Sequence, residues 1–118
     1  MVEALQTWLM SQGYTNIYLD SLPPSGDAIR LFCWDHKLNR LSLGPGTEYV
    51  QVSVRRSDYD EAKAVSNELT ALLDSGPDED DFELSPGMFC VIRPRRGPVL
   101  SERNNKEHTF YFEIALCG

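Results

Sequence analysis

Cys33, Asp35 and His36 bring a thiol, a carboxyl group and an imidazole close together in the sequence. A thiol beside an imidazole is the pairing that activates a cysteine nucleophile. In an extended segment, however, positions 33 and 36 point to opposite faces, so the two side chains meet only if the chain bends. We therefore expect a core cysteine followed by a polar histidine at the end of a strand. The alternative to this structural interpretation is that the chain is a small α+β enzyme that uses Cys33, His36 and an acidic loop.

The other groups that could take part in catalysis or bind a metal are spread along the chain. Cys90 and Cys117 lie in apolar, strand-like segments, and the chain has no CxxC pair of the kind that binds structural zinc. We expect all three cysteines to be reduced and to act as small hydrophobic side chains. His108 is expected to be an ordinary polar residue at the start of a strand. The sequence therefore predicts no cofactor, no metal centre and no enzymatic activity.

An acidic run offers carboxylate oxygens, which are the ligands that hard cations prefer. It consists of Asp78, Glu79, Asp80, Asp81 and Glu83, and it lacks the spacing of an EF-hand loop. We expect a solvated loop, with a weak cation site or a partner contact as the alternative.

The basic residues are concentrated in one segment. Arg93, Arg95 and Arg96 lie in or beside Pro94-Arg95-Arg96-Gly97-Pro98, and Arg103 follows nearby. Two prolines and a glycine predict a rigid turn that interrupts a strand, and a rigid turn binds a partner at a low ordering cost. We expect this segment to be one of two things. It is either a loop that docks onto a partner or lines the lumen of an assembly, or a turn that is simply solvated.

The composition is that of one globular domain over residues 1–118. Apolar residues make up 42% of the chain and charged residues 25%, and the net charge is −7. This negative charge argues against binding nucleic acid by bulk electrostatics, so we expect no specific binding to duplex DNA. The sequence shows no apolar run near the ~18 residues that span a bilayer, and we expect neither a signal peptide nor a membrane partner.

Residues 49–73 are the most informative segment, because their apolar period changes from that of a strand to that of a helix. The alternating valines and the helical stripe are Val50, Val52 and Val54, then Ala62, Val65, Leu69, Leu72 and Leu73. Ser57 or Asp58 caps the predicted helix, and Gly76 with the following proline ends it. Arg55 and Arg56 end the strand, where they either pair with a neighbouring subunit or face solvent.

The remaining elements are short. Predicted helices cover residues 2–12 and 58–75. Predicted strands cover residues 28–34, 48–55, 88–93 and 108–116, with an extended segment at 16–19, loops at 22–27 and 35–46, and polar turns at 76–81 and 100–107. This order predicts an α+β domain with an antiparallel or mixed sheet of about four strands packed against two helices. The expected core consists of Val50, Val52, Val54, Leu69, Leu72, Phe110, Phe112 and Ile114.

In their order and spacing, several of these features resemble the minor capsid and tail terminator proteins of long-tailed bacteriophages. The closest similarity lies in residues 49–62, where Val54-Arg55 ends a strand and Asp58-Tyr59 opens a helix. The other similar features are the N-terminal helix, the turn Leu22-Pro23-Pro24, the turn Arg96-Gly97-Pro98-Val99-Leu100, a polar hairpin through Asn104, and the closing strand His108-Thr109-Phe110-Tyr111-Phe112. The acidic run and the loop at 35–46 do not match a motif of the family.

The resemblance implies a tail-terminator-like fold and a structural role. Such proteins form a hexameric ring that caps the tail tube and joins it to the head connector or completion protein, with DNA passing through the lumen. The implied location is the neck of the virion, and the host cytoplasm during assembly. In such a ring, our hypothesis is that Arg55, Arg56, Arg93, Arg95, Arg96 and Arg103 contact a neighbouring subunit or the tail tube, and that the acidic run faces the lumen or a partner.

The charge of the chain has consequences for such a ring. Six copies at −7 each carry about −42, and the part of this charge that faces the lumen repels DNA phosphates, which allows the genome to slide. Because charged copies repel one another, we expect monomers at low concentration and easier ring formation as salt rises. A cellular adaptor with the same fold is a third possibility.

Overall fold

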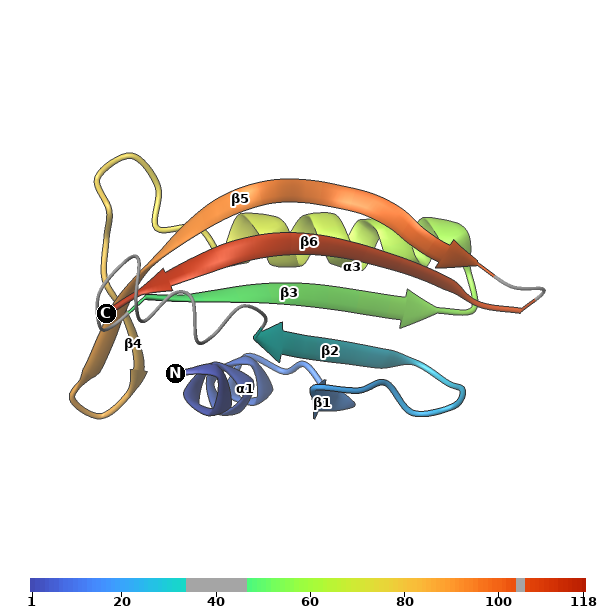
Figure 1. Ribbon diagram of the computed structural model, residues 1–118, viewed down its shortest axis with the longest axis horizontal. Coiled ribbons are helices and arrows are strands. Elements are labelled where there is room, and N and C mark those ends of the chain that lie inside the picture. Colours follow the sequence, from blue (N-terminus) through green and yellow to red (C-terminus); the bar gives the residue numbers. More distant parts are fainter. Residues whose placement is uncertain (34–46, 104–105) are drawn as a thin grey trace.

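The computed structural model describes residues 1–33, 47–103 and 106–118 (Figure 1). These residues form two helices, α1 (Val2–Ser11) and α3 (Tyr59–Leu72), and six strands. The strands are β1 (Ile17–Leu19), β2 (Ala28–Cys33), β3 (Thr47–Arg56), β4 (Phe82–Ser85), β5 (Met88–Arg103) and β6 (His108–Cys117). They form one sheet in the order β1-β2-β3-β6-β5-β4. Within the described ranges, neither helix combines the length and the apolar character that crossing a membrane requires.

The α+β class predicted from the sequence is confirmed, and the sheet is mixed. β1 runs parallel to β2, whereas the other neighbouring pairs are antiparallel. The prediction of about four strands was too coarse. It treated β1 only as an extended segment, and it missed β4, which forms a hairpin with β5 across a turn in which Gly87 has a φ of 82°. The predicted loop at 35–46 lies outside the described residues.

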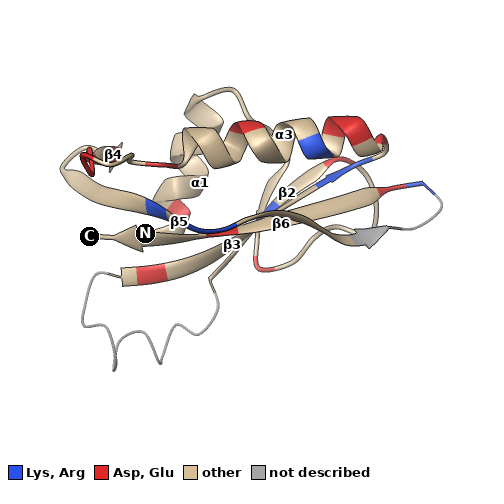
Figure 2. Ribbon diagram, turned by 90° about the horizontal axis from the view of Figure 1, so that it is seen from above, with Lys and Arg blue, Asp and Glu red and all other residues tan. Residues whose placement is uncertain are grey.

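The long central strands β3 and β6 place their apolar side chains on one face of the sheet. Val50, Val52 and Val54 lie opposite Ile114, Phe112 and Phe110, respectively. In β2, Ile29 lies opposite Val54 and Leu31 lies opposite Val52, so the same face continues across three strands. Both helices cover this face (Figure 2): α3 packs against β3, β5 and β6, and α1 packs against β1, β2 and β4.

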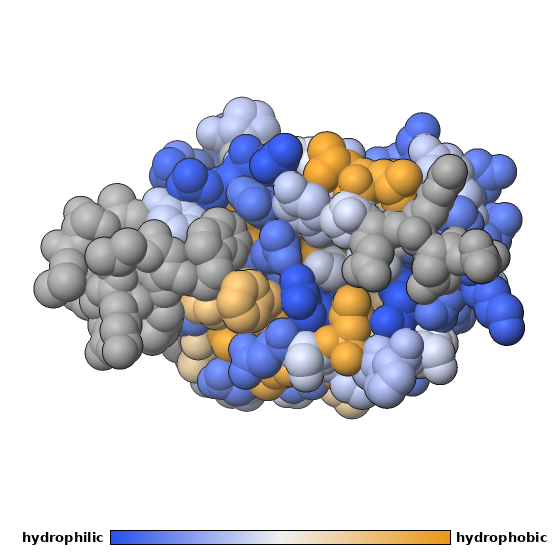
Figure 3. Space-filling view, turned by 45° about the vertical axis from the view of Figure 1, so that its right-hand side comes forward, coloured by the Kyte–Doolittle hydropathy of each residue, from blue (hydrophilic) through white to orange (hydrophobic). Residues whose placement is uncertain are grey.

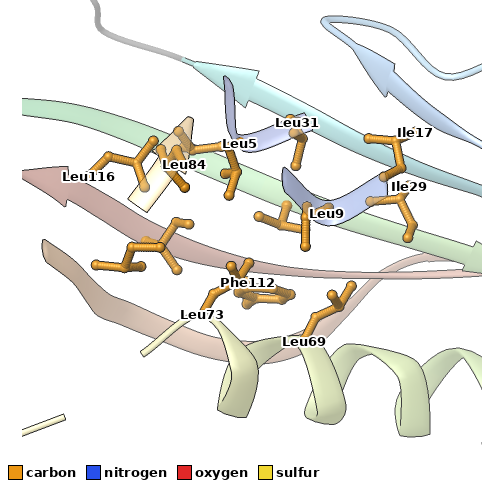
Figure 4. Packing of buried hydrophobic residues seen from close by; sticks show 14 of the residues in the cluster. Leu5, Leu9, Ile17, Ile29, Leu31, Leu69, Leu73, Leu84, Phe112 and Leu116 are labelled. Carbon is orange, nitrogen blue, oxygen red and sulfur yellow. The ribbon is translucent and has the colours of Figure 1, made fainter. Parts of the chain in front are cut away.

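The hydrophobic core fills the space between this face and the two helices (Figure 4). Leu5 and Leu9 come from α1, Leu69 comes from α3, and all three are fully buried against the sheet. Trp8 packs against the edge of the core, where its ring lies edge-on to Phe82 of β4 at 5.3 Å between centroids. The missed strand β4 therefore closes the end of the core next to α1.

Two members of the predicted core lie elsewhere. Leu72 is only partly buried, and the adjacent Leu73 is fully buried instead. α3 ends at Leu72, and Leu73 leaves the helical conformation with φ −92° and ψ 58°, which accompanies its burial in the core. Phe110 is buried but lies outside the main cluster, where its ring contacts that of Tyr59 at 5.3 Å. The other six predicted core residues belong to the cluster as expected.

The start of α3 agrees with the sequence, and its end does not. Asp58 is the N-cap, and its carboxylate accepts a hydrogen bond of 2.9 Å from the Glu61 N–H. The helix was predicted to continue to residue 75, but it stops at Leu72, before the turn in which Gly76 has a φ of 79°. Ser75 is buried in this turn and bonds to β5, so the chain has already left the helix when it reaches the glycine.

The segment Pro94-Arg95-Arg96-Gly97-Pro98 was predicted to be a turn, and this prediction is wrong. β5 continues through it as one strand of 16 residues, interrupted only by register shifts of the β-bulge type. The predicted polar turn at 100–107 also begins too early, because Leu100 and the three residues after it are still paired with β6 or within β5.

Proline is tolerated here because of the direction of the backbone. The Ile92 N–H donates to Ser75 Oγ at 2.8 Å, and the Ile92 carbonyl accepts from the Ser75 N–H at 2.9 Å. Ile92 therefore directs its polar groups away from β6, and residues two apart in a strand share that direction. The nitrogen of Pro94 also faces away from β6, so its missing N–H costs no bond with β6. β4 pairs with β5 only at residues 88–90, so at Pro94 the side of β5 that faces away from β6 is a sheet edge, and a proline there discourages another strand from pairing with it.

Candidate interaction surface on the outer face of the sheet

The face of the sheet that points away from α1 and α3 carries polar and aromatic side chains. We call it the outer face and define it by these strand residues: Arg30, Phe32, Tyr49, Gln51, Ser53, Arg93, Arg95, Arg96, Tyr111, Glu113 and Ala115. The strand register places them there, since Tyr49, Gln51 and Ser53 lie opposite Ala115, Glu113 and Tyr111. Figure 3 shows hydrophobic side chains lying among hydrophilic ones on this side of the molecule.

A single extra residue in β5 places two consecutive arginines on the outer face. Pro94 lies opposite Ile114 and Arg96 lies opposite Glu113, so Arg95 is the additional residue between them. In a regular strand, adjacent side chains point to opposite faces. Here the Arg95 guanidinium lies 4.1 Å from the centre of the Tyr49 ring, and that of Arg96 lies 5.5 Å from the centre of the Tyr111 ring. Both distances are within the range of cation–π attraction.

A shallow hollow of about 350 Å³ lies beside the first of these pairs. It is lined by Thr47, Tyr49, Arg93, Pro94, Arg95, Ala115 and Cys117. Two of these residues are exposed arginines, and the Arg93 guanidinium donates to the Glu79 carboxylate at 2.8 Å. Since both partners of that ion pair are exposed, it contributes little to stability and can exchange for another carboxylate. The hollow therefore suits an acidic or hydrogen-bonding side chain.

A further arginine lies on the same face in β2. The Arg30 guanidinium donates to Gln51 Oε1 at 2.6 Å and to Ser53 Oγ at 3.4 Å, and it lies 5.3 Å from the centre of the Phe32 ring. Arg30 is partly exposed. Its neighbours across the strands could not be known from the sequence, because they depend on the register between β2 and β3.

Arg55 and Arg56 are used inside the fold. Arg55 is 8% exposed, its Nε donates to the Gly26 carbonyl at 2.8 Å, and the same atom lies 3.7 Å from the Glu107 carboxylate. Arg56 forms ion pairs with Asp27 at 3.9 Å and with Glu61 at 3.5 Å. Arg55 is therefore neither simply exposed to solvent nor available to a neighbouring subunit. It links the loop before β2 to the end of β3. The Arg103 side chain lies outside the described part of the chain.

The acidic run is exposed, as the sequence indicated. Glu79 pairs with Arg93, and Glu83 accepts a hydrogen bond of 3.3 Å from the Gly87 N–H in the β4–β5 turn. In the described part of the chain, the cysteine, histidine and acidic side chains do not form a group of three or more that could hold a metal ion.

Cys33 lies in a setting that opposes ionisation. Burial, followed by the charge of Glu48, raises the pKa of this thiol from 9.0 to about 11. The thiol donates to Glu48 Oε1 at 3.8 Å, and the same carboxylate lies 2.9 Å from the N-terminal ammonium of Met1. Because the thiolate is the nucleophilic form, a raised pKa makes Cys33 a poor nucleophile at neutral pH. His36, its partner in the alternative enzyme, lies outside the described residues.

The structure thus groups the predicted site residues differently from the sequence. Arg93, Arg95 and Arg96 share one surface, while Arg55 and Arg56 belong to the interior and its rim. The sequence did not indicate the contribution of Tyr49 and Tyr111 to this surface. Their positions in the strand alternation could have placed them on the same face, but their arginine partners follow from the bulge.

A scan against protein-family models finds no match for this chain, and a comparison with curated proteins also finds none.

Proposed function

We propose that this chain is a tail terminator or closely related neck protein of a long-tailed bacteriophage. The proposal rests on the resemblance described above, and the observation that carries it is the junction between β3 and α3. There a strand ends at Arg56, Asp58 caps the helix that follows, and Tyr59 is the first helical residue. The two helices on one face of a sheet are compatible with the fold that the resemblance implies.

In this proposal the mechanism is geometric and involves no chemical step. Six copies form a ring through a head-to-tail interface, in which one surface of each copy binds a different surface of the next. One rim of the ring stops growth of the tail tube, and the other receives the head connector or completion protein. The exposed acidic run from Asp78 to Glu83 faces the lumen or a partner, where its charge keeps passing DNA from binding.

The direct test is the assembly of tails in the presence and absence of the protein. Purified tail tube protein is polymerised with the wild-type chain, and tube lengths are measured by electron microscopy. We expect capped tubes with a ring at one end, and uncapped tubes that continue to grow when the chain is left out. Tubes of unchanged length that carry no bound chain would contradict the proposal.

A matched variant separates this function from the enzyme alternative. Cys33→Ser removes the thiol and leaves a side chain of similar size, so a structural protein should still cap tubes and join heads. Loss of joining by this variant, with its folding intact by circular dichroism, would favour the enzyme instead. Light scattering of the wild-type chain, alone and with tubes, gives the mass of the assembled species.

A further inference from the structure

The two sides of this molecule carry exposed charges of opposite sign. Among the described side chains of β5, the exposed charged ones are Arg93, which pairs with Glu79, and Arg95 and Arg96. On the other side, α3 and its ends expose Asp58, Asp60, Glu61, Glu68 and Asp74, with Lys63 as the exposed cation of that helix. The helix is red along most of its charged positions in Figure 2, whereas β5 carries blue positions.

We infer that the arginine-bearing outer face of one copy docks against the exposed acidic face of α3 in a second copy. This inference rests on the proposed ring and deepens it by naming the two surfaces. The occupant is a second copy because the chain itself supplies the complementary charge. Contacts between two outer faces, or between two α3 helices, would bring like charges together. Charge complementarity therefore favours a head-to-tail arrangement, which is the kind that closes into rings.

The arginines are held in a conformation that favours such contact. Arg95 and Arg96 lie over the rings of Tyr49 and Tyr111, so part of their rotamer freedom is already lost in the free protein. The conformational-entropy cost of ordering these two side chains on a partner carboxylate is therefore lower. The planar guanidinium also offers paired donors to a carboxylate while its face remains on the ring.

The opposing surface is suited to close approach. Between its acidic residues, the exposed side of α3 presents Ala64, Asn67 and Ala71, which are short side chains. A helix with short residues between charged ones can lie close to a flat partner, and the carboxylates of Asp60 and Glu68 then reach toward it. Glu68 is also the acceptor of a hydrogen bond from the Tyr14 hydroxyl, which fixes its position.

A charge-swap experiment with purified protein tests the contact without any tail component. The first variant, Arg95→Glu with Arg96→Glu, makes the outer face acidic. The second variant, Asp60→Lys with Glu68→Lys, makes the face of α3 basic. In each variant alone, the outer face and the α3 face that meet in the contact carry charges of the same sign. We therefore expect association at least about tenfold weaker than that of the wild type. In a 1:1 mixture, every contact between alternating variants pairs opposite charges again, so assembly should be restored.

Alternation gives a second readout. A closed ring of strictly alternating variants contains an even number of copies and equal amounts of both, which native mass spectrometry of isotope-labelled partners can count. Glu3→Lys, an exposed change on α1, controls for the effect of net charge and should assemble like the wild type. Circular dichroism of each variant checks that it is folded before it is mixed.

Several results would overturn the inference. It fails if the glutamate variant self-associates like the wild type, if the mixture stays dissociated, or if the wild type does not self-associate at any concentration. It also fails if Asp78→Lys with Asp80→Lys complements the glutamate variant while the α3 variant does not, because the acidic run is then the partner surface. Restored assembly of a mixture that does not cap tail tubes would support the contact and contradict the proposed function alone.

Discussion

Leu69 and Leu72 offer a sharp test of the core, because they are the same residue type three positions apart on α3 and differ in burial. Leu69 is fully buried, whereas Leu72 packs against the core from its edge and is only partly buried. We expect Leu69→Ala to destabilise the protein strongly and Leu72→Ala to destabilise it weakly. A comparison within one helix largely cancels the difference in helix propensity between leucine and alanine.

The magnitude follows from the atoms removed. Leu69→Ala deletes three buried carbon atoms, worth about 2.4 kcal/mol at ~0.8 kcal/mol each. Leu69 packs with Leu73 and Phe112 in the cluster shown in Figure 4, so the surroundings relax only partly and the cavity adds to the loss. The expected total is about 3 to 4 kcal/mol, within the range of about 2 to 5 kcal/mol for such changes. For Leu72→Ala we expect about 1 kcal/mol, because Leu72 lies at the edge of the core and part of its surface is already in water.

Urea denaturation followed by circular dichroism measures both values, provided that the transition is two-state and its slope is unchanged. In a thermal scan, an unfolding entropy of about 2.1 cal/mol/K per residue converts 3 kcal/mol into a shift of roughly 12 °C for this chain. Equal losses for the two variants, or a larger loss at Leu72, would refute the assignment of Leu69 to the buried side of α3 and of Leu72 to its edge.

Three further predictions concern the cap, the thiols and the salt dependence. Asp58→Ala should cost about 1 kcal/mol in urea denaturation, whereas the exposed neighbour Ser57→Ala should cost close to nothing; equal losses would remove Asp58 as the cap. Burial is the largest of the effects that raise the pKa values of the Cys33 and Cys90 thiols from 9.0 to about 11. The folded state therefore holds these protons more tightly than the unfolded state. The stability gained is complete below pH 9 and lost as pH rises through about 11, and thermal scans of wild type and Cys90→Ala across this window should converge on the alkaline side. Self-association measured by light scattering should be strongest near ~0.15 M salt, where the Debye length of ~8 Å screens repulsion between whole copies but leaves contact pairs, and it should weaken at ~1 M; a steady rise to ~1 M would favour repulsion alone.

The parts of this fold that the sequence predicted well are those with local causes. In β3 the valines alternate because one face of the strand packs on the helices, and the cap of α3 needs only Asp58 and the N–H three residues later. Such signals depend on neighbours in the chain, so a single sequence contains them. The positions of Tyr49 and Gln51 on the outer face follow from the same alternation.

The errors have non-local causes. Pro94, Gly97 and Pro98 are turn residues by local rules, yet β5 passes through them because it lies at an edge where Ser75 occupies the outward bonds at Ile92. The inward position of Leu73 depends on where α3 ends, which its apolar period does not determine. The burial of Arg55 depends on Gly26 and Glu107, which are far from it in the chain. Each of these features requires knowledge of which segments meet.

The bulge at Arg95 connects the edge of the sheet with the candidate interaction surface. Prolines, arginines and register shifts make the free edge of β5 a poor template for another strand, so backbone pairing is disfavoured as a means of assembly. The same extra residue turns Arg95 to the side of Arg96 and brings both guanidinium groups over tyrosine rings. The bulge at Arg95 therefore contributes to closing this edge to strand addition, and it also places two arginines on the outer face. Removing the extra residue by deleting Arg95 should restore strand alternation between Pro94 and Arg96, free the Tyr49 ring and weaken self-association while the core remains intact.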